Sequence, residues 1–307
     1  MNKNNFKNNI PEGFAGPTSL PRSEKEAYSW QEANLSWWEN NPMRYDWKEK
    51  IEFAEFTEGF YKEIDKRFFS NAEEYLPSRE KPFDLLIDFK SLLKMDVLEI
   101  GVGNGSNAQL LAGNAKSFTG IDITDYAIKS VKKRFEIFNL PGRIIKMDAE
   151  KLDFPNNSFD FVWSWGVIHH SSNTEKILKE IQRVLRQNGK AIIMVYYKGW
   201  WNYYCMGFIK GIISGNLFRT KSLHKTVQFF TDGAIARYYT ANDWRLLIKN
   251  LFKMEWINVF GPKADILLLP AGRIKKFICL IMPRILSRFL THKLKMGSFL
   301  VFQMRKY

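Results

Sequence analysis

A glycine-rich segment near residue 100 is the part of this sequence best suited to bind a ligand. An apolar run carrying one acid, Glu99, leads into glycines at 101, 103 and 105, and a helical pattern follows directly. A strand, a tight turn and a helix N-terminus in this order present bare backbone to a nucleotide-like ligand. The dinucleotide pattern G-x-G-x-x-G needs its third glycine where Ser106 stands, so that match is imperfect. A tight turn that binds nothing is the alternative.

Acidic residues follow the next two predicted strands. Asp122 ends the strand 117–121, about 20 residues after the first glycine, where one carboxylate can accept hydrogen bonds from both hydroxyls of a ribose. Asp148 follows the strand 143–147, where it can accept a hydrogen bond from an adenine amine. Both acids, like Glu99, have the alternative role of a turn or capping residue, and an NAD enzyme would also show an acid at position 122.

His169 and His170 are the candidates for proton transfer. They follow a predicted turn and strand in 156–165, at the carboxyl end of the sheet, where ligands of open α/β sheets bind. Histidine is the usual base near neutral pH, although one of these rings could instead only hydrogen-bond the loop backbone. The chain has four His and no Cys/His cluster with metal-ligand spacing, so we expect no metal site.

The ordered set of motifs resembles the class I S-adenosylmethionine-dependent methyltransferases, and most closely their quinone-biosynthesis and small-molecule branch. The matching pieces are E-x-G-x-G-x-G (99–105), Asp122, D-A-x-x-L-x-F (148–154), N-S-F-D (157–160), G-V-I-H-H (166–170) and R-V-L-R-Q-N-G-K (183–190). Alternating strands and helices over 95–197 predict parallel strands with right-handed crossovers. The resemblance implies a Rossmann-like α/β fold with a seven-stranded, mostly parallel sheet and an antiparallel last strand.

The resemblance also implies which residues contact S-adenosylmethionine. At the matching positions these are Glu99, Gly101, Gly103, Gly105, Asp122, Ile123, Asp148, Ala149, Trp165 and Gly166. The glycines would admit the methionine moiety, with Glu99 near its amino group. Asp122 would bind the ribose, and Asp148 the adenine edge. Arg44 or Tyr45, from the segment before the first strand, would reach the cofactor carboxylate.

The chain divides into a helical N-terminal extension, 1–93, and a methyltransferase domain, 94–307. We expect helices over 48–76, 82–93, 175–186 and 241–251, with an N-cap at Asn173 or Thr174 and a capping box from Thr240 to Asp243. Insertions at 198–239 and 261–296 interrupt the domain. In the second, apolar positions share one helical face: 274, 277, 278 and 281. A basic amphipathic helix of this kind favours contact with a membrane surface, and packing on the domain itself is the alternative.

Charge is unevenly distributed along the 307 residues. Residues 1–197 hold 27 Lys and Arg against 28 Asp and Glu, whereas residues 198–307 hold 19 against 4. Such a basic block indicates an anionic partner, namely a phosphate-bearing substrate, a membrane surface or a nucleic acid, unless it is only a solvated face. Two distant cysteines, a polar N-terminus and no apolar run of about 18 residues predict a cytoplasmic protein, with peripheral membrane contact as a further expectation.

These observations lead to one main functional hypothesis and two alternatives. The main hypothesis is direct in-line transfer of a methyl group from S-adenosylmethionine to a small-molecule acceptor that is apolar or lipid-linked, with His169 or His170 as the base if the acceptor is a hydroxyl. The alternatives are an RNA methyltransferase that uses the basic C-terminal third, and a cofactor-binding scaffold without catalysis. Nucleic acid is the less favoured partner, because the sequence has no recognised RNA-binding motif.

Overall fold

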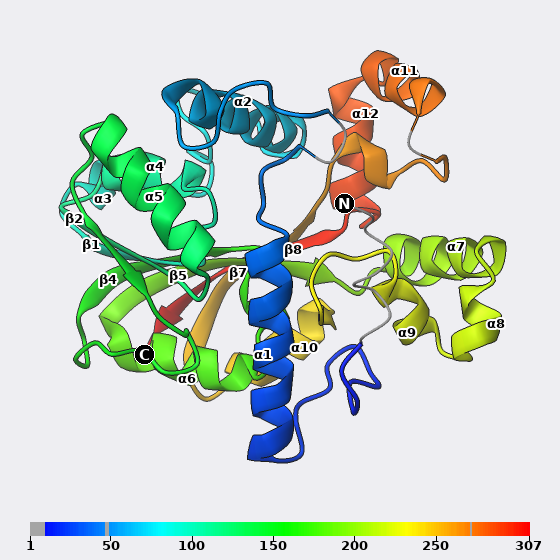
Figure 1. The fold of residues 1–307 in the computed structure, drawn as a ribbon, viewed down its shortest axis with the longest axis horizontal. Helices are drawn as coiled ribbons and strands as arrows, with labels where there is room; N and C mark the ends of the chain where they lie inside the picture. The colour runs from blue at the N-terminus through cyan, green and yellow to red at the C-terminus, as the bar shows by residue number, and fades with distance from the viewer. Residues whose placement is uncertain (1–9, 47–48, 271) are drawn as a thin grey trace.

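The computed structural model describes residues 10–46, 49–270 and 272–307. These residues fold around one mixed sheet with the strand order β3-β2-β1-β4-β5-β8-β7 (Figure 1). The strands are β1 (Asp96–Ile100), β2 (Ser117–Asp122), β3 (Arg143–Lys146), β4 (Phe159–Trp165), β5 (Leu185–Tyr197), β6 (Tyr238–Tyr239), β7 (Phe252–Phe260) and β8 (Phe299–Lys306).

The direction of the strands confirms the predicted fold class. Strands β1 to β5 pair in parallel, whereas β8 lies between β5 and β7 and runs antiparallel to both. The short β6, which pairs in parallel with the end of β5, is an additional strand that the sequence did not predict. Parallel neighbours place the ends of β1, β2 and β4 at one edge of the sheet, and that edge carries the candidate ligand-binding loops.

Helices cover both faces of the sheet (Figure 1). They are α4 (Ser106–Ala112) and α5 (Asp125–Ile137) on one face, and α6 (Thr174–Val184) and α10 (Ala241–Ile248) on the other. Consecutive residues of β1 point to opposite cores: Val97 packs in the cluster that contains Val131 of α5, and Leu98 packs in the cluster that contains Ile181 of α6. The alternation of side chains along a strand therefore places one hydrophobic layer on each side.

The predicted helix starts are confirmed at two positions. Asn173 accepts a hydrogen bond from the Lys176 N–H at the start of α6. Thr240 and Asp243 form the reciprocal capping box of α10, with each side chain accepting from the backbone N–H of the other residue. Both caps satisfy donors that the first turn of a helix leaves without an intrahelical acceptor.

The N-terminal extension is less helical than the sequence pattern predicted. Its helices are α1 (Glu24–Asn40), α2 (Glu58–Tyr75) and α3 (Phe89–Leu92). The helix expected over 48–76 begins only at Glu58, because Thr57 is extended and its side chain accepts from the Phe60 N–H as an N-cap; residue 48 lies outside the described residues. The helix expected over 82–93 is reduced to α3, because the φ of +63° at Phe83 is not helical and because Asp88 is extended and accepts from the Lys90 and Ser91 N–H groups as an N-cap.

The two insertions project from the same side of the molecule, at the right and the upper right of Figure 1. The first contains η2 (Trp200–Met206), α7 (Gly207–Ile213), α8 (Asn216–Thr220) and α9 (Leu223–Gln228). The second contains η3 (Lys263–Asp265), α11 (Arg273–Ile281), α12 (Arg284–Arg288) and η4 (Phe289–Lys293). Among the described residues, no helix is both long and apolar enough to cross a bilayer.

Arg237 is a fully buried side chain that joins distant parts of the chain. Its guanidinium donates to the carbonyl oxygens of Ser19 at 2.8 Å and Ser172 at 2.6 Å, and also to that of Ser171. The same group lies over the rings of Phe14 and Trp30, so it ties the N-terminal extension to the loop after β4.

We predict that Arg237→Met lowers the free energy of unfolding by about 2–4 kcal/mol, because three carbonyl groups lose a charged donor in a site without water access. Urea unfolding followed by circular dichroism measures this loss. Arg245→Met, on the exposed side of α10, is the matched control and should change stability by no more than about 0.5 kcal/mol. Equal losses in the two variants would contradict the structural role of Arg237.

Candidate active site

A cavity of about 360 Å³ opens at the carboxyl ends of β1, β2 and β4. Three parts of the chain form its walls: the N-terminal extension, the loops that follow the strands, and the segment after β5. Helix α1 crosses this edge of the sheet in Figure 1, and its residues Gln31, Asn34 and Trp38 line the cavity. The extension therefore covers the site that the sheet positions.

The glycine loop forms one wall of the cavity with a backbone that only glycine adopts easily. Gly101, Gly103 and Gly105 have φ values of +81°, +53° and +84°. A Cβ on Gly101 would lie 2.3 Å from a methyl group of Val167, whereas a Cβ on Gly103 would meet nothing within 4 Å. Gly101 is thus required by packing inside the protein, and Gly103 faces open space in the cavity.

Asp122 connects the loops that follow β1 and β2. Its carboxylate accepts hydrogen bonds from the Gly103 N–H at 3.1 Å, the Thr124 N–H at 3.0 Å and the Thr124 hydroxyl at 2.8 Å. Burial raises the pKa of Asp122, and these three donors act against that rise. Because Asp122 also lines the cavity, the residue that holds the loop is exposed to any ligand beside it.

Glu99 places an unsatisfied carboxylate oxygen at the cavity wall. The residue is 2% exposed, and no described residue hydrogen-bonds its buried Oε2. Burial, together with the charge of Asp122, raises the pKa of Glu99 well above its usual value. A buried acceptor without a partner is costly, so the site favours a ligand that brings a donor or a positive charge to this position.

Asp148 contacts both the cavity and the N-terminal extension. One carboxylate oxygen accepts from the Gln31 side chain of α1 at 2.9 Å, and the other accepts from the Glu150 N–H at 2.8 Å. Gln31 in turn accepts from the Ser172 N–H at 3.0 Å, in the loop after β4. The position that the sequence assigned to the adenine edge is therefore also a docking point for α1.

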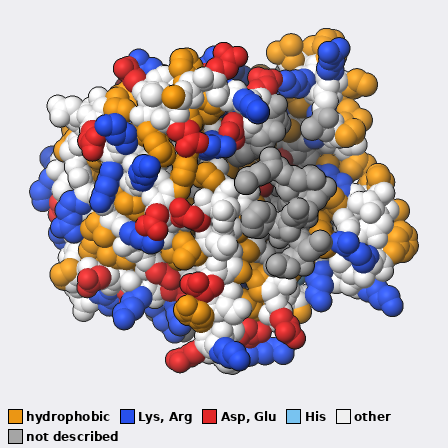
Figure 2. Space-filling view, in the orientation of Figure 1, with side chains coloured by type: hydrophobic (Ala, Val, Ile, Leu, Met, Phe, Trp, Pro, Cys, Tyr) orange, Lys and Arg blue, Asp and Glu red, His pale blue; other side chains and the backbone are white. Residues whose placement is uncertain are grey.

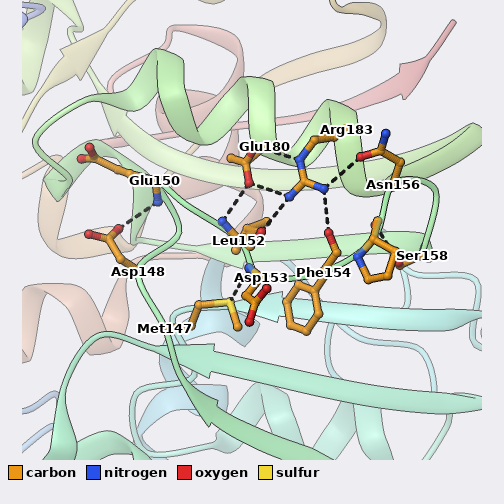
Figure 3. Close-up of polar contacts among 11 residues, drawn as sticks. Met147, Asp148, Glu150, Leu152, Asp153, Phe154, Asn156, Ser158, Glu180 and Arg183 are labelled. Carbon is orange, nitrogen blue, oxygen red and sulfur yellow. Dashed lines mark hydrogen bonds and ion pairs between the residues drawn. The ribbon is translucent and has the colours of Figure 1, made fainter.

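A polar network on α6 holds the segment that follows β3 in place (Figure 3). Arg183 pairs with Glu180 and donates to the carbonyl oxygens of Leu152 and Phe154 at 2.7 and 2.6 Å. Glu180 accepts from the Leu152 N–H at 2.8 Å. Two side chains on one helix thus bind the backbone just after Asp148 and hold the segment 148–154 against α6.

The remaining sequence-predicted cofactor residues divide into two groups. Ile123, Ala149, Trp165 and Gly166 line the cavity. Arg44 does not; its guanidinium lies 3.0 Å from Asp46 and also pairs with Glu55. Its neighbour Tyr45, the other residue predicted to reach the cofactor carboxylate, does line the cavity.

The two histidines have different positions. His170 lines the cavity, and its Nδ1 lies 2.8 Å from the Ile235 carbonyl oxygen, so Nδ1 carries the proton and Nε2 is the free acceptor. Its Nε2 is buried and has no partner among the described residues. Burial lowers the pKa of His170 to about 4.

His169 is not part of the cavity wall. Its ring is fully buried between those of His170 and Tyr196, and this burial lowers the pKa of His169 well below its usual value.

Sequence reasoning missed two polar residues that line the cavity together with His170. Tyr196 is the second-last residue of β5, where its ring centroid lies 5.5 Å from that of His170, and Asp232 lies in the first insertion. Burial, with the nearby charge of Asp232, raises the pKa of Tyr196 well above its usual value. The position of Tyr196 at the end of a strand was an available signal, whereas nothing in the sequence around Asp232 indicates that the chain returns there.

Comparison with known proteins gives a family for the central segment. A methyltransferase domain model matches residues 98–193. Phosphatidylethanolamine N-methyltransferase of Cereibacter sphaeroides is 30% identical over 103 residues, 33% of this chain and 50% of that protein. Phthiotriol/phenolphthiotriol dimycocerosates methyltransferase of Mycobacterium leprae (strain TN) is 38% identical over 96 residues, 30% of this chain and 34% of that protein. The chain thus spans half the length of the first relative and about a third of the second.

Residues 98–193 form a class I S-adenosylmethionine-dependent methyltransferase domain. The crystal structure of MccD protein has the same fold, with a TM-score of 0.50 and 17% identity over 73% of this chain and 96% of that chain. The cofactor of the domain is S-adenosylmethionine. The cavity fits it, because the unpartnered Glu99 oxygen, the open space at Gly103 and the Asp122 carboxylate lie on one wall. Among the described residues, no group of His, Cys, Asp and Glu has the arrangement of a metal site.

Gly103→Ala should leave the methyltransferase domain folded and weaken S-adenosylmethionine binding at least about tenfold. The new methyl group meets no protein atom within 4 Å, but it occupies cavity space beside the loop. Calorimetry with S-adenosylmethionine and S-adenosylhomocysteine measures the effect. Gly215→Ala is the control, since it has a φ of +72° and equal open space outside the cavity, so it carries the same backbone cost of about 1–2 kcal/mol. Unchanged affinity in Gly103→Ala would place the cofactor elsewhere.

His170 should remain neutral at pH values where an exposed histidine is already protonated. The expected midpoint is about 4, because burial opposes the charged ring. Nuclear magnetic resonance of the imidazole Cε1–H signal, assigned by comparison with His170→Gln, measures it. A midpoint near the ordinary value of about 6.5 would mean that water or a charged partner reaches the ring.

Proposed function

We propose that this protein transfers a methyl group from S-adenosylmethionine to a small apolar acceptor, in the class that includes lipid-linked molecules. The observation that carries the proposal is that one cavity has two chemically different walls. The glycine loop, Asp122 and Asp148 form the first wall. Aromatic side chains from α1, α2, β8 and the segment between α1 and α2 form the second: Trp38, Tyr45, Phe68, Tyr75 and Phe299.

The names of two relatives agree in chemical class with an apolar acceptor. One relative is named for phosphatidylethanolamine and the other for phthiotriol and phenolphthiotriol dimycocerosates. The matched segment in each case is the cofactor-binding part, so these names support the class of acceptor and not its identity. The aromatic wall supports the same class, because apolar ligands gain most from burial against such side chains.

The walls of the cavity also suit the chemistry. When bound, S-adenosylmethionine supplies a methyl group on a positively charged sulfur, which is already a good leaving group. The protein must then align the acceptor atom with the methyl group and keep water out, and such positioning contributes up to about 7–11 kcal/mol in the best cases. Trp165 and Gly166 would flank the reacting methyl group, while Gln31, Asn34 and Trp38 of α1 form part of the cavity wall.

His170 is the residue placed to accept a proton from the acceptor. Its Nδ1–H donates to the Ile235 carbonyl oxygen, which leaves the Nε2 lone pair without a partner among the described residues, on a ring that lines the cavity. A hydroxyl oxygen becomes strongly acidic as it gains the methyl group, so a ring with a pKa of about 4 is basic enough to take its proton at Nε2. The neutral ring also avoids placing a fixed positive charge beside the cofactor sulfonium.

Labelled S-adenosylmethionine and fractionated cell extract test the proposed acceptor class. The purified protein is offered a lipid extract, a water-soluble small-molecule extract and total RNA in separate reactions. We expect labelled product in the lipid extract, detected as a new species after chromatography and mass spectrometry. Label confined to RNA or to the water-soluble extract would overturn the proposal, and so would cofactor binding without transfer to any fraction.

His170→Gln should lower kcat by about 10²–10⁴-fold and leave the affinity for S-adenosylmethionine nearly unchanged, because it removes a proton acceptor but no cofactor contact. His292→Gln is the matched control, since His292 does not line the cavity. Equal kcat values for wild type and His170→Gln would show that the acceptor needs no base from this residue.

A further inference from the structure

Two insertions carry most of the large hydrophobic side chains that this protein exposes. In the first insertion they include Ile213, 79% exposed, and Phe218, 70% exposed. In the second they include Leu280, 79% exposed, and Ile285, 84% exposed. Hydrophobic side chains gather over α7, α8 and α11 in Figure 2, with Lys and Arg among them. A cluster of this kind on a soluble fold marks an interaction surface.

Helix α11 shows that the apolar face is not packed on the domain. The sequence left two possibilities for the amphipathic pattern at 274–281, namely a face buried against the protein and a face open to a partner. No residue of α11 is buried, and Ile274, Phe277 and Ile281 on its apolar face are all exposed. Packing against the described part of the protein therefore does not explain this pattern.

The two insertions form one connected surface. The indole N–H of Trp200 donates to the Leu294 carbonyl at 2.9 Å, and that of Trp201 donates to the Asp265 carbonyl at 2.9 Å. The Asn202 side chain donates to the Met296 carbonyl. These bonds fix η2 of the first insertion to the second, so the exposed residues of both belong to a single docking surface. We define this docking surface as the exposed side chains of 198–230 and 266–295.

The charge of the docking surface is strongly positive. Residues 198–230 contain five Lys or Arg and residues 266–295 contain seven, and neither range contains an acid. The acids next to these ranges have other roles: Asp232 lines the cavity, and the carboxylate of Asp265 accepts from the Ser298 N–H and hydroxyl. Exposed basic residues, including Arg273 and Arg284, alternate with the exposed apolar ones.

We propose that this docking surface binds the face of an anionic lipid bilayer, with its apolar side chains inserted at the headgroup level and its basic side chains on lipid phosphates. Amphipathic elements with exposed Trp, Phe and Leu beside Lys and Arg bind membranes in this way. A second copy of the chain is disfavoured as the occupant, because a contact through the same surface on both copies would bring like charges together. A nucleic acid would use the charge but not the aliphatic side chains.

The docking surface lies close to the cavity. Arg288 of α12 donates to the carbonyl oxygens of Glu73 and Glu74 at the end of α2. Two other residues of α2, Asn71 and Tyr75, line the cavity. Membrane docking would therefore hold the cavity one helix away from the lipid headgroups. An apolar acceptor is concentrated in the bilayer beneath those headgroups.

Vesicle co-sedimentation of the 307-residue protein tests the docking surface without reference to methyl transfer. We expect at least about tenfold stronger binding to phosphatidylcholine vesicles that contain about one third phosphatidylglycerol than to phosphatidylcholine alone, and a loss of that difference at high salt. Equal binding to both vesicles, or to neither, would overturn the proposal. Retention of RNA but not of anionic vesicles would overturn it as well.

Paired variants identify the residues responsible. Leu280→Glu with Ile285→Glu should weaken vesicle binding at least about tenfold, whereas Leu246→Glu on α10, 65% exposed outside the docking surface, should not. Arg273→Gln with Arg284→Gln should weaken binding to anionic vesicles only, with Arg245→Gln as the control.

S-adenosylmethionine affinity, measured by calorimetry, should be the same in all these variants and shows that each is folded. A dimer in solution that Leu280→Glu with Ile285→Glu dissociates, together with no wild-type binding to vesicles, would assign the surface to a second copy and overturn the proposal. Failure of docking would leave the cavity and its proposed reaction intact, because the two experiments share no readout.

Discussion

The hydrogen bond from the Gly103 N–H to the Asp122 carboxylate is the interaction on which the site depends. It joins the loop after β1 to the loop after β2, and parallel pairing of those strands is what brings the two loops to one edge. Asp122 is held there although burial raises its pKa, and Glu99 adds a second buried acid close by. The fold thus concentrates unfavourable negative charge at one wall, which a ligand with a positive charge would relieve.

The N-terminal extension completes the site by contacting both a cavity residue and the backbone of the loop after β4. Gln31 of α1 binds Asp148 and the Ser172 N–H, and Arg237 binds the carbonyl oxygens of Ser171 and Ser172 from the other side. The loop after β4 is therefore held between the extension and the segment after β5. Because the same loop carries His170, the position of the ring depends on both of these additions to the methyltransferase domain.

Sequence patterns predicted the glycine loop, the acid at the end of β2 and the helix caps because these features follow local rules. A glycine at positive φ, an acid at the end of a strand and a capping box each depend on a few neighbouring residues, and Gly101, Asp122 and Thr240 follow those rules. The predicted start of α2 was wrong by ten residues, because the helical spacing of apolar residues continues through a segment of bends and turns that precedes the N-cap Thr57. The contribution of Asp232 to the cavity could not be predicted, because it depends on the first insertion returning to the cavity, which no local pattern indicates.

In the C-terminal third, the net charge predicted the class of partner but not which basic residues are available to bind it. The count of basic residues in 198–307 indicated an anionic partner, but only the structure separates residues that serve the fold from those left outside. Arg237 is fully buried and Lys263 donates to the carbonyl oxygens that end α11, so both act inside the protein. The exposed residues Arg273 and Arg284 lie instead beside apolar side chains that are largely exposed, such as Ile274 and Ile285. Only charges of this second kind can contribute to binding an external surface, and their apolar neighbours favour a lipid surface over a purely ionic partner.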